Sequence, residues 1–358
     1  MSLDELRKRI DGIDVQIVRL INERAEIAHK IGEVKAEFND SVYKPHREEA
    51  VYEHAIKAND GPIRDESVRA VFREIMSGCI ALEKALKVAY LGPPGTFTHW
   101  AARSKFGDSV NYEPSKSLEE VFAEVERGRA DYGVVPVENS TEGGIRDTLA
   151  RFLESPLKVC AEIVIEIHHS LMANCNLQEI KTVYSKGTVF GQTRGWLREH
   201  LPDADLVDVP STSKAAALAS QQDHAAAIGH KQLTAAYGLQ LLFENIEDTP
   251  DNVTRFFVVG NHMSGPTGDD KTAVLCSVRD KVGALHSLLT PFKEFGINMT
   301  KIESFPARGL KWQYYFFIDF IGHPENEDVQ QAMEAMKQEC TEFIVLGAFP
   351  QQADGETD

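Results

Sequence analysis

Apolar residues in the N-terminal segment recur every three or four positions. They are Leu6, Ile10, Ile13, Ile17, Leu20, Ile27, Ile31, Val34 and Phe38. This spacing predicts one long amphipathic helix that starts near residue 3. Two shorter helices are predicted around residues 47–57 and 68–86. A helix of about 35 residues is about 50 Å long, so this set of helices favours a helical dimer over a compact monomer.

The pattern changes after residue 87 to short apolar runs separated by helical stretches. Strands are predicted at residues 88–91, 132–137, 163–167, 182–185, 206–209 and 225–229, and the apolar stretch that ends at residue 260 adds a last one. Their alternation with helices predicts a mainly parallel sheet divided into two α/β lobes around a cleft. Polar turns at strand ends are where such folds bind ligands. One of these turns, residues 251–254, runs directly into the last strand.

A third pattern follows a Gly- and Pro-containing linker at residues 261–271. Its order is strand, helix, strand, strand, helix, strand, at residues 272–278, 283–295, 299–305, 314–321, 327–338 and 343–349. This order predicts a ferredoxin-like α+β module without catalytic groups of its own. Residues 351–358 are polar and predict a disordered tail. We therefore expect domains at residues 1–87, 88–262 and 270–350.

Composition narrows the classes of protein. The 358 residues suit about two to three domains. A formal net charge of −17 argues against a nucleic-acid partner, which needs a basic surface. The five cysteines have no C-x-x-C spacing, so neither a disulfide framework nor a zinc site is expected. The pair His168–His169 has no accompanying ligand cluster, and core or edge histidines are the better interpretation.

The sequence shows no targeting or membrane signal. The chain begins with a helix and has no charged leader, apolar stretch and cleavage site. No apolar run approaches the roughly 18 residues that a membrane span needs. We expect a cytoplasmic protein that does not bind membranes.

Cations stand where the first helix should be apolar. The spacing calls for an apolar residue at the position of Arg24, and burying an unpaired guanidinium is costly, so Arg24 needs an anionic partner. Lys35 lies eleven residues later, within about 20° on the helical wheel, and both can face one pocket. Arg7 lies well round the helix and more easily serves a neighbouring chain. Taken singly, Arg7, Lys44 and Glu48 are better explained as solvated charges.

The combination of these charges resembles the all-helical chorismate mutase family across nearly all of residues 1–87. The resemblance implies an intertwined dimer in which each pocket takes Arg7 from the partner chain. Chorismate is a dicarboxylate that rearranges to prephenate without a nucleophile, so cations and a hydroxyl acceptor such as Glu48 suffice. The implied chorismate-binding residues are Arg7, Arg24, Lys35, Lys44, Arg47, Glu48, Cys79 and Glu83, with Arg24, Lys35 and Glu83 as catalytic residues.

Three of these positions depart from the best-known bacterial pattern. Lys44 replaces an aspartate, Glu83 a glutamine and Cys79 a serine. An ionised Glu83 would repel the negative charge that develops on the ether oxygen. We therefore predict that Glu83 acts as a neutral donor whose pKa is raised by burial. These departures also leave open the alternative that the helical domain is inactive and that only the central domain, described next, is an active enzyme.

The central region carries four turn motifs in order. They are Gly92-Pro93-Pro94-Gly95-Thr96-Phe97, Pro136-Val137-Glu138-Asn139-Ser140, Ser211-Thr212 and Asn252-Val253-Thr254-Arg255-Phe256. The first lacks the glycine spacing of a nucleotide-binding loop, so nicotinamide and ATP are not expected. Each turn alone could be a simple helix cap. Together they resemble prephenate dehydratase, which implies two α/β lobes like a periplasmic binding protein, with prephenate in the cleft.

Prephenate loses its ring hydroxyl and its ring carboxylate. The catalytic threonine of the family corresponds to Thr254, a positioned donor to the leaving oxygen, with Arg255 or a nearby group polarising the site. Ser185-Lys186-Gly187 stands where members often carry Ser-His-Pro, so Ser185 is a weak candidate. The implied prephenate-binding residues are Thr96, Glu138, Asn139, Ser140, Ser185, Ser211, Asn252, Thr254, Arg255 and Phe256.

The C-terminal module resembles the ACT regulatory domain through residues 283–285 and 302–306. The resemblance implies phenylalanine bound between two such modules and inhibiting the dehydratase. Phe305 stands where dehydratases usually have an arginine. A purely structural module is the alternative. The implied phenylalanine-binding residues are Gly283, Ala284, Leu285, Asn298, Glu303 and Ser304.

The sequence therefore predicts a fused enzyme that converts chorismate through prephenate to phenylpyruvate. Its expected partners are chorismate, prephenate, phenylalanine and further copies of the chain, as a homodimer or a dimer of dimers. No metal and no cofactor are expected. The alternative from another class is a non-catalytic amino-acid sensor, which would need neither Thr254 nor the cation at Arg24.

Overall fold

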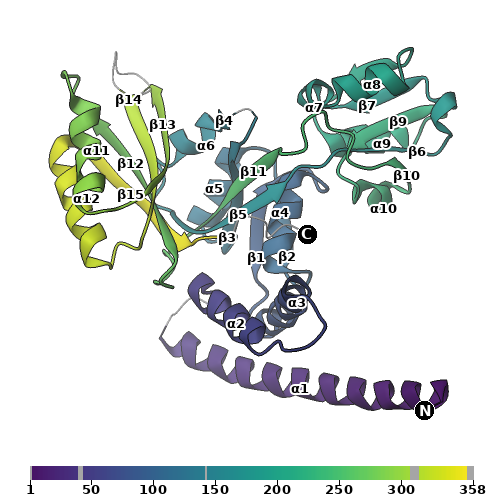
Figure 1. The fold of residues 1–358 in the computed structure, drawn as a ribbon, viewed down its shortest axis with the longest axis horizontal. Coiled ribbons are helices and arrows are strands. Elements are labelled where there is room, and N and C mark those ends of the chain that lie inside the picture. The colour runs from purple at the N-terminus through teal and green to yellow at the C-terminus, as the bar shows by residue number, and fades with distance from the viewer. Residues whose placement is uncertain (1, 39–42, 142, 307–313, 353–358) are drawn as a thin grey trace. The chain divides into compact units, whose positions relative to one another are not determined.

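The computed structural model describes residues 2–38, 43–141, 143–306 and 314–352 (Figure 1). Its chain packs into two units. The first comprises residues 1–87 with residues 103–111, and the second comprises residues 88–102 with residues 112–358. Packing thus assigns residues 103–111 to the helical unit, although the sequence places them in the predicted central domain. The predicted tail lies outside the described residues from 353 onward.

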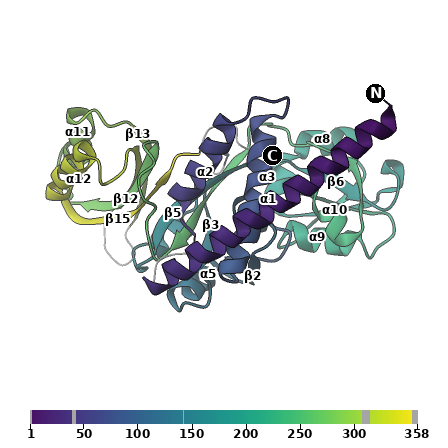
Figure 2. The same ribbon diagram turned by 90° about the horizontal axis from the view of Figure 1, so that it is seen from below.

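The first unit is helical, as predicted. Its helices are α1 (Leu3–Glu37), α2 (Pro45–Lys57) and α3 (Asp65–Glu83). Figure 2 shows α1 as one continuous rod. Every residue from 2 to 20 is exposed, including Leu6, Ile10 and Ile13. The predicted apolar stripe therefore exists, and within a single chain its N-terminal half is not covered.

The first lobe of the second unit combines strands and helices. Its elements are β1 (Lys87–Leu91), α4 (Phe97–Phe106), β2 (Asn111–Ser115), α5 (Leu118–Glu126), β3 (Tyr132–Asn139), β4 (Gly143–Gly144), α6 (Arg146–Arg151), β5 (Lys158–Glu166) and β11 (Val253–Gly260). The chain leaves this lobe at the end of β5 and returns at the start of β11. These two strands lie side by side along their whole length.

The second lobe lies between β5 and β11 in sequence. Its elements are β6 (Ser170–Ala173), η1 (Leu177–Glu179), β7 (Thr182–Ser185), α7 (Gly187–Gln192), α8 (Arg194–His200), β8 (Asp205–Asp208), α9 (Thr212–Ala219), β9 (Ala225–Gly229), α10 (Leu233–Tyr237) and β10 (Gln240–Phe243). Alternate residues of its strands enter two separate cores. One includes Val189 and Leu197 of α7 and α8. The other includes Ala216 of α9 and Leu233 of α10, so helices cover both faces of the sheet.

The expectation of a mainly parallel sheet is wrong. Strands β1 and β3 are parallel, and β7 is parallel to both β8 and β9. However, β11 runs antiparallel to both β3 and β5, and β6 runs antiparallel to β9 and β10. The mixture follows from the connection between lobes, because a chain that leaves along β5 and returns along the adjacent β11 must reverse its direction.

The C-terminal module has the predicted strand and helix order. Its elements are β12 (Asp270–Val278), α11 (Ala284–Glu294), β13 (Met299–Pro306), β14 (Tyr314–Ile321), α12 (Glu327–Glu339) and β15 (Cys340–Pro350). Figures 1 and 2 both show α11 and α12 on the same side of these strands. Leu288, Phe292 and Met336 of the two helices bury that side.

The first lobe and the C-terminal module share a sheet and a core. Among the described residues, ten strands form one sheet in the order β13-β14-β12-β15-β5-β11-β3-β1-β2, with β4 paired to β3. The module joins the lobe where Gly347 of β15 pairs with Val159 of β5. Phe257 of β11 lies 5.5 Å from Phe349 and 6.1 Å from Phe317, measured between ring centroids. This continuity brings the module next to strand β11.

Candidate functional site

The start of β11 and the end of β3 form the centre of the predicted dehydratase site. Thr254 pairs with Asn139 in the strand register. The Asn139 side-chain amide donates to the Thr254 hydroxyl, with Nδ2 and Oγ1 2.8 Å apart, and it also donates to Asn252 Oδ1 at 2.8 Å. Because Oγ1 of Thr254 accepts this bond, its own proton is left for another acceptor. The structure thus brings three predicted residues together.

A chain of hydrogen bonds continues from Asn139 into the second lobe. Thr141 donates to Asn139 Oδ1 from both its backbone N–H, at 3.0 Å, and its hydroxyl, at 2.5 Å. Gln192 at the end of α7 donates to Thr141 Oγ1 at 3.4 Å. Gln192 Oε1 lies 2.7 Å from Nε2 of the buried His169. With His169 as the donor, every donor and acceptor in this chain is matched.

The state of His169 is set by its surroundings. Burial lowers the pKa of His169, which favours a neutral imidazole. Donation through Nε2 then leaves Nδ1 as an acceptor, and Nδ1 has no hydrogen-bond partner among the described residues. Phe97 packs edge-on against His169 and against His230, with ring centroids 5.9 and 5.6 Å apart. The sequence favoured a core or edge histidine at this position, and the burial of His169 agrees with that.

Gln192 and Thr141 were not singled out from the sequence. Gln192 lies 51 residues from Thr141 in the chain, and no local spacing connects them. Thr141 directly follows Glu138-Asn139-Ser140 in the same polar turn, and that position was a usable signal. The contact itself depends on how the two lobes fold together.

Four other predicted prephenate residues use their hydroxyls to hold the backbone. Ser140 Oγ accepts from Val253 N at 2.9 Å, which fixes the Thr254 strand against the turn. Thr96 donates to Leu91 O, and Ser185 donates to Ile228 O. Ser211 caps α9 by accepting from Lys214 N. In this conformation the hydroxyls of Thr96, Ser185 and Ser211 therefore bond to the backbone, and their role in binding prephenate stays a prediction.

Arg255 has a different environment from the one expected of it. Arg255 donates to Glu162 Oε2 at 2.8 Å and forms an ion pair with Asp319 of β14. Strand alternation directs Arg255 and its neighbour Thr254 to opposite faces. Burial acts to lower the pKa of Arg255, but Asp319 and Glu162 together raise it above its ordinary value. Arg255 therefore links β11 to the C-terminal module, and its role in polarising the site stays a prediction.

Phe256 is buried, with 1% of its surface exposed, and its role in binding prephenate stays a prediction. The strand register between β11 and β3 shifts between Arg255 and Phe256. This irregularity lies directly beside Thr254, where it changes the twist of the strand.

Glu138 connects the same turn to the C-terminal module. Lys301 Nζ of β13 lies 2.7 Å from Glu138 Oε1 and 3.5 Å from Glu303 Oε2. Glu303 also packs over Gly144, where a Cβ would come within 1.7 Å of Glu303 Oε2. Gly144 pairs with Glu138, and Gly143 pairs with Asn139. A predicted effector residue, Glu303, therefore touches the turn that positions Asn139.

The other predicted effector residues lie on two elements of the module. Gly283 precedes α11 with a positive φ of 82°, and Ala284 and Leu285 form its first turn. Asn298 accepts through its backbone from Ile321 N, and Ser304 lies on β13. Phe305, the departure from the dehydratase motif, is buried and stacks on Tyr315 with ring centroids 5.9 Å apart. The position of the usual arginine is thus part of the core here.

Three of the predicted mutase residues, Arg24, Cys79 and Glu83, lie along the contact between α1 and α3. Arg24 Nη1 lies 3.1 Å from Cys79 Sγ. One turn further along α3, Glu83 packs over Gly32 of α1, where a Cβ would come within 2.7 Å of its Cγ. Burial raises the pKa of Glu83, against the opposing charges of Lys35 and His29. Glu83 Oε2 is buried without a hydrogen-bond partner among the described residues.

The remaining predicted mutase residues lie elsewhere in the chain. Arg7 is exposed and lies 3.8 Å from Asp4. It is 17 residues from Arg24, which is about 25 Å along a helix. Lys44 is half-buried at the start of α2, and Arg47 is exposed. Glu48 is largely buried beside Tyr43, Tyr52 and Lys105.

Metal and membrane sites are not found in the described part of the chain. No group of three or more His, Cys, Asp or Glu residues there could hold a metal ion. Among the helices described, none combines the length and apolar character needed to cross a membrane.

Comparisons with known proteins cover all three regions. The family models for chorismate mutase type II, prephenate dehydratase and the ACT domain match residues 6–84, 88–264 and 272–338. A bifunctional chorismate mutase/prephenate dehydratase of Aquifex aeolicus is 44% identical over 98% of both chains. A counterpart from Pseudomonas aeruginosa is also 44% identical over 98% of both chains.

Solved structures resemble the part of the chain after the helical unit. A prephenate dehydratase from Arthrobacter aurescens in complex with L-Phe is 34% identical, with a TM-score of 0.68, over 74% of this chain and 90% of that one. A protein titled as a novel type of quorum quenching acylase, GqqA, is 26% identical, with a TM-score of 0.69, over 74% of this chain and 98% of that one. Because the bifunctional relatives match over the full length at higher identity, the chain belongs to the bifunctional chorismate mutase/prephenate dehydratase family, with a C-terminal ACT domain.

Proposed function

We propose that the protein rearranges chorismate to prephenate in its helical unit and converts prephenate to phenylpyruvate at Thr254. The observation that carries the second activity is the hydrogen bond from Asn139 to Thr254, because it leaves the threonine proton free for the substrate. The match to a bifunctional relative over 98% of both chains supports the presence of the two activities in one chain.

Thr254 serves the dehydratase step as a donor to the ring hydroxyl that leaves. The electrons of the bond to the departing carboxylate move into the ring, carbon dioxide is released, and the hydroxyl takes up a proton and leaves as water. Asn139 fixes the direction of the Thr254 hydroxyl, and Thr141 and Gln192 fix Asn139. A donor already oriented toward the developing charge lowers the barrier without reorganisation.

The mutase site requires a second copy of the chain. Arg7 and Arg24 are too far apart on one helix to share a pocket, so Arg7 reaches the pocket of a neighbour. The exposed stripe on α1, with Leu6 at 44%, Ile10 at 57% and Leu20 at 64% exposure, supports the same arrangement. Pairing two such helices buries these side chains. A homodimer is therefore the smallest assembly that completes the site.

Phenylalanine is the proposed inhibitor. We propose that it binds Glu303, which lies beside the Glu138 turn of the catalytic lobe. The ammonium group of an amino acid suits the Glu303 carboxylate, which in this structure shares Lys301 with Glu138. A relative with 34% identity was solved with L-Phe bound. Inhibition requires that phenylalanine bind more tightly to an arrangement in which the Asn139 turn is displaced.

One assay separates this function from the alternatives. Chorismate is supplied to the purified chain, and prephenate and phenylpyruvate are followed separately, with and without phenylalanine. Both products should form, and phenylalanine should slow the second. A non-catalytic sensor gives neither product. An enzyme with only the dehydratase half gives phenylpyruvate from added prephenate and none from chorismate.

A further inference from the structure

Glu48 is the predicted acceptor for the ring hydroxyl of chorismate, and its environment is already polar. Lys105 Nζ lies 2.8 Å from Glu48 Oε2, and the Tyr43 hydroxyl donates to the same oxygen at 2.9 Å. The Tyr52 hydroxyl donates to Oε1 at 3.1 Å. Burial and the nearby Glu48 carboxylate raise the pKa of Tyr52, so this hydroxyl remains a donor.

These contacts use most of the acceptor positions of Glu48. A carboxylate offers about four such positions, and among the described residues Lys105, Tyr43 and Tyr52 occupy three of them. The Glu48 side chain is only 9% exposed, and Lys105 supplies the opposite charge next to it. A largely buried carboxylate without such a partner is costly, and it turns toward solvent or neutralises. Lys105 therefore controls whether Glu48 remains available as an acceptor.

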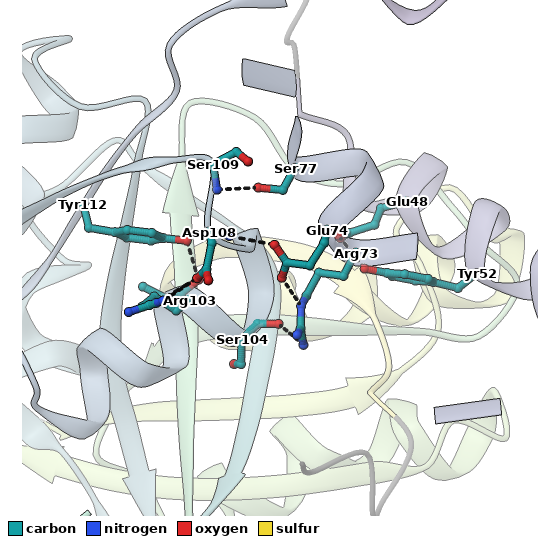
Figure 3. A network of polar contacts seen from close by, with 11 residues as sticks. Glu48, Tyr52, Arg73, Glu74, Ser77, Arg103, Ser104, Asp108, Ser109 and Tyr112 are labelled. Atoms are coloured by element: carbon teal, nitrogen blue, oxygen red, sulfur yellow. Dashed lines mark hydrogen bonds and ion pairs between the residues drawn. The ribbon is translucent and has the colours of Figure 1, made fainter. Parts of the chain in front are cut away.

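Lys105 belongs to α4, which by sequence is the first helix of the dehydratase domain. The segment that carries it, residues 103–111, is bound to α3 by several backbone contacts (Figure 3). Ser109 N donates to Ser77 Oγ at 3.1 Å, and Asp108 N donates to Glu74 Oε2 at 3.0 Å. Arg73 Nη1 donates to Ser104 O at 3.3 Å. The docking is therefore built from specific hydrogen bonds.

Two apolar and steric contacts fix the same segment. The ring of Phe106 lies 4.9 Å from that of Tyr43, one of the donors to Glu48. Gly107 has a φ of +72°, and a Cβ there would come within 2.6 Å of Ser77 Cβ. Only glycine suits both the backbone angle and the close approach. The neighbours of Lys105 thus hold it against the helical unit.

We propose that Lys105 is a positioning residue for the mutase reaction, which holds Glu48 ready to accept the chorismate hydroxyl. A segment of the dehydratase domain thereby completes the mutase site of the same chain. This inference rests on the proposed role of Glu48, and the experiment below tests the two separately.

The test compares steady-state mutase and dehydratase kinetics of full-length variants. Lys105→Met should raise KM for chorismate about tenfold with a smaller change in kcat, because a hydrogen bond to the substrate hydroxyl acts in both the ground state and the transition state. Lys105→Arg, which keeps a cation, should restore part of the loss. Lys116→Met removes an exposed lysine from the same domain and should change neither activity. Dehydratase turnover from added prephenate should remain near normal in all three variants.

A double-mutant cycle with Glu48→Gln tests whether Lys105 acts through Glu48. If Lys105 acts through Glu48, adding Lys105→Met to Glu48→Gln should cause little further loss. Additive losses, or an unchanged KM in Lys105→Met beside an impaired Glu48→Gln, would overturn the role of Lys105 and leave the Glu48 site intact. Normal mutase kinetics in Glu48→Gln itself would remove Glu48 from the site, and the inference would fail with it. Loss of both activities in Lys105→Met, without rescue by arginine, would indicate a folding defect and contradict a positioning role.

Discussion

Asn139 donates a hydrogen bond to Thr254, with Nδ2 and Oγ1 2.8 Å apart. The direction of this bond matters more than its length. Thr254 accepts from Asn139, so its proton points elsewhere, and Asn139 itself is oriented because Thr141 donates to its other side-chain atom. A hydroxyl oriented in this way can stabilise a leaving oxygen without first breaking a bond to the protein.

Replacing Asn139 by aspartate should separate the effect of its hydrogen-bond donors from the effect of its side-chain size. Asn139→Asp keeps the size of the side chain but removes its N–H donors, so the Thr254 hydroxyl should turn toward the new carboxylate. We expect dehydratase kcat to fall about 100-fold, the usual effect of losing one well-placed donor. Mutase turnover of the same preparation is the control. Thr254→Ala sets the lower limit of activity, and a near-normal kcat in Asn139→Asp would contradict the proposed orientation.

Glu83 should give the mutase an unusual pH dependence. Burial raises the pKa of Glu83, so the carboxyl is protonated below that raised value and ionised above it. Donation to the ether oxygen needs the protonated form, so mutase kcat/KM should decline as pH rises through the raised pKa. Glu83→Gln keeps a neutral donor at every pH and should flatten the decline. An identical pH profile in wild type and Glu83→Gln would rule out this role.

Asp319 should contribute strongly to the stability of the second unit. It is fully buried and paired with Arg255. Removing its charge leaves the buried Arg255 guanidinium with Glu162 alone, and Glu162 also pairs with Lys271, so the positive charge there is only partly compensated. Asp319→Asn should lower the free energy of unfolding by about 3 kcal/mol. Urea unfolding followed by the fluorescence of the three tryptophans measures this change.

An exposed ion pair supplies the control for Asp319. Glu334 lies 3.6 Å from Lys337, and its side chain is 67% exposed. Glu334→Gln should change the free energy of unfolding by less than about 0.5 kcal/mol. Equal effects at Asp319 and Glu334 would show that the buried pair has no special weight.

Gly144 and Glu303 should govern inhibition by phenylalanine. A side chain at Gly144 would displace Glu303, since a Cβ would come within 1.7 Å of its Oε2. Gly144→Ala and Glu303→Gln should each raise the phenylalanine concentration for half-inhibition about tenfold, the usual effect of losing a hydrogen bond to a charged group. Gly191→Ala, where no atom lies within 4 Å of the added Cβ, is the matched control. Unchanged inhibition in both variants would exclude this route.

Most of the fold could be predicted from the spacing of apolar residues along the chain. The spacing of Leu6, Ile10 and Ile13 predicted α1, and the order of elements in the C-terminal module was correct. The prediction of mainly parallel strands was wrong because local patterns do not show which strands become neighbours. β5 and β11 are separated by the whole second lobe and still pair along their length.

Some residues of the candidate site could likewise be predicted from the sequence, and others could not. Thr254 and Asn139 could be singled out because both stand in polar turns at strand ends. Gln192 and Lys105 could not, because each becomes significant through a contact with a residue more than 50 positions away. The ion pairs of Arg255 could not be predicted, because strand alternation sends its side chain to the face opposite Thr254, where Asp319 and Glu162 lie.

The docking of residues 103–111 has a consequence for dividing this protein. A cut after residue 87 follows the family boundary, but it would strip the helical unit of the segment that covers Ser77 and Glu74. The fully buried Ser77 would then face water, and Glu48 would lose its lysine. We therefore expect a free-standing mutase made from this chain to need either a graft of that segment or a redesigned α3 surface. The two activities share more than a linker.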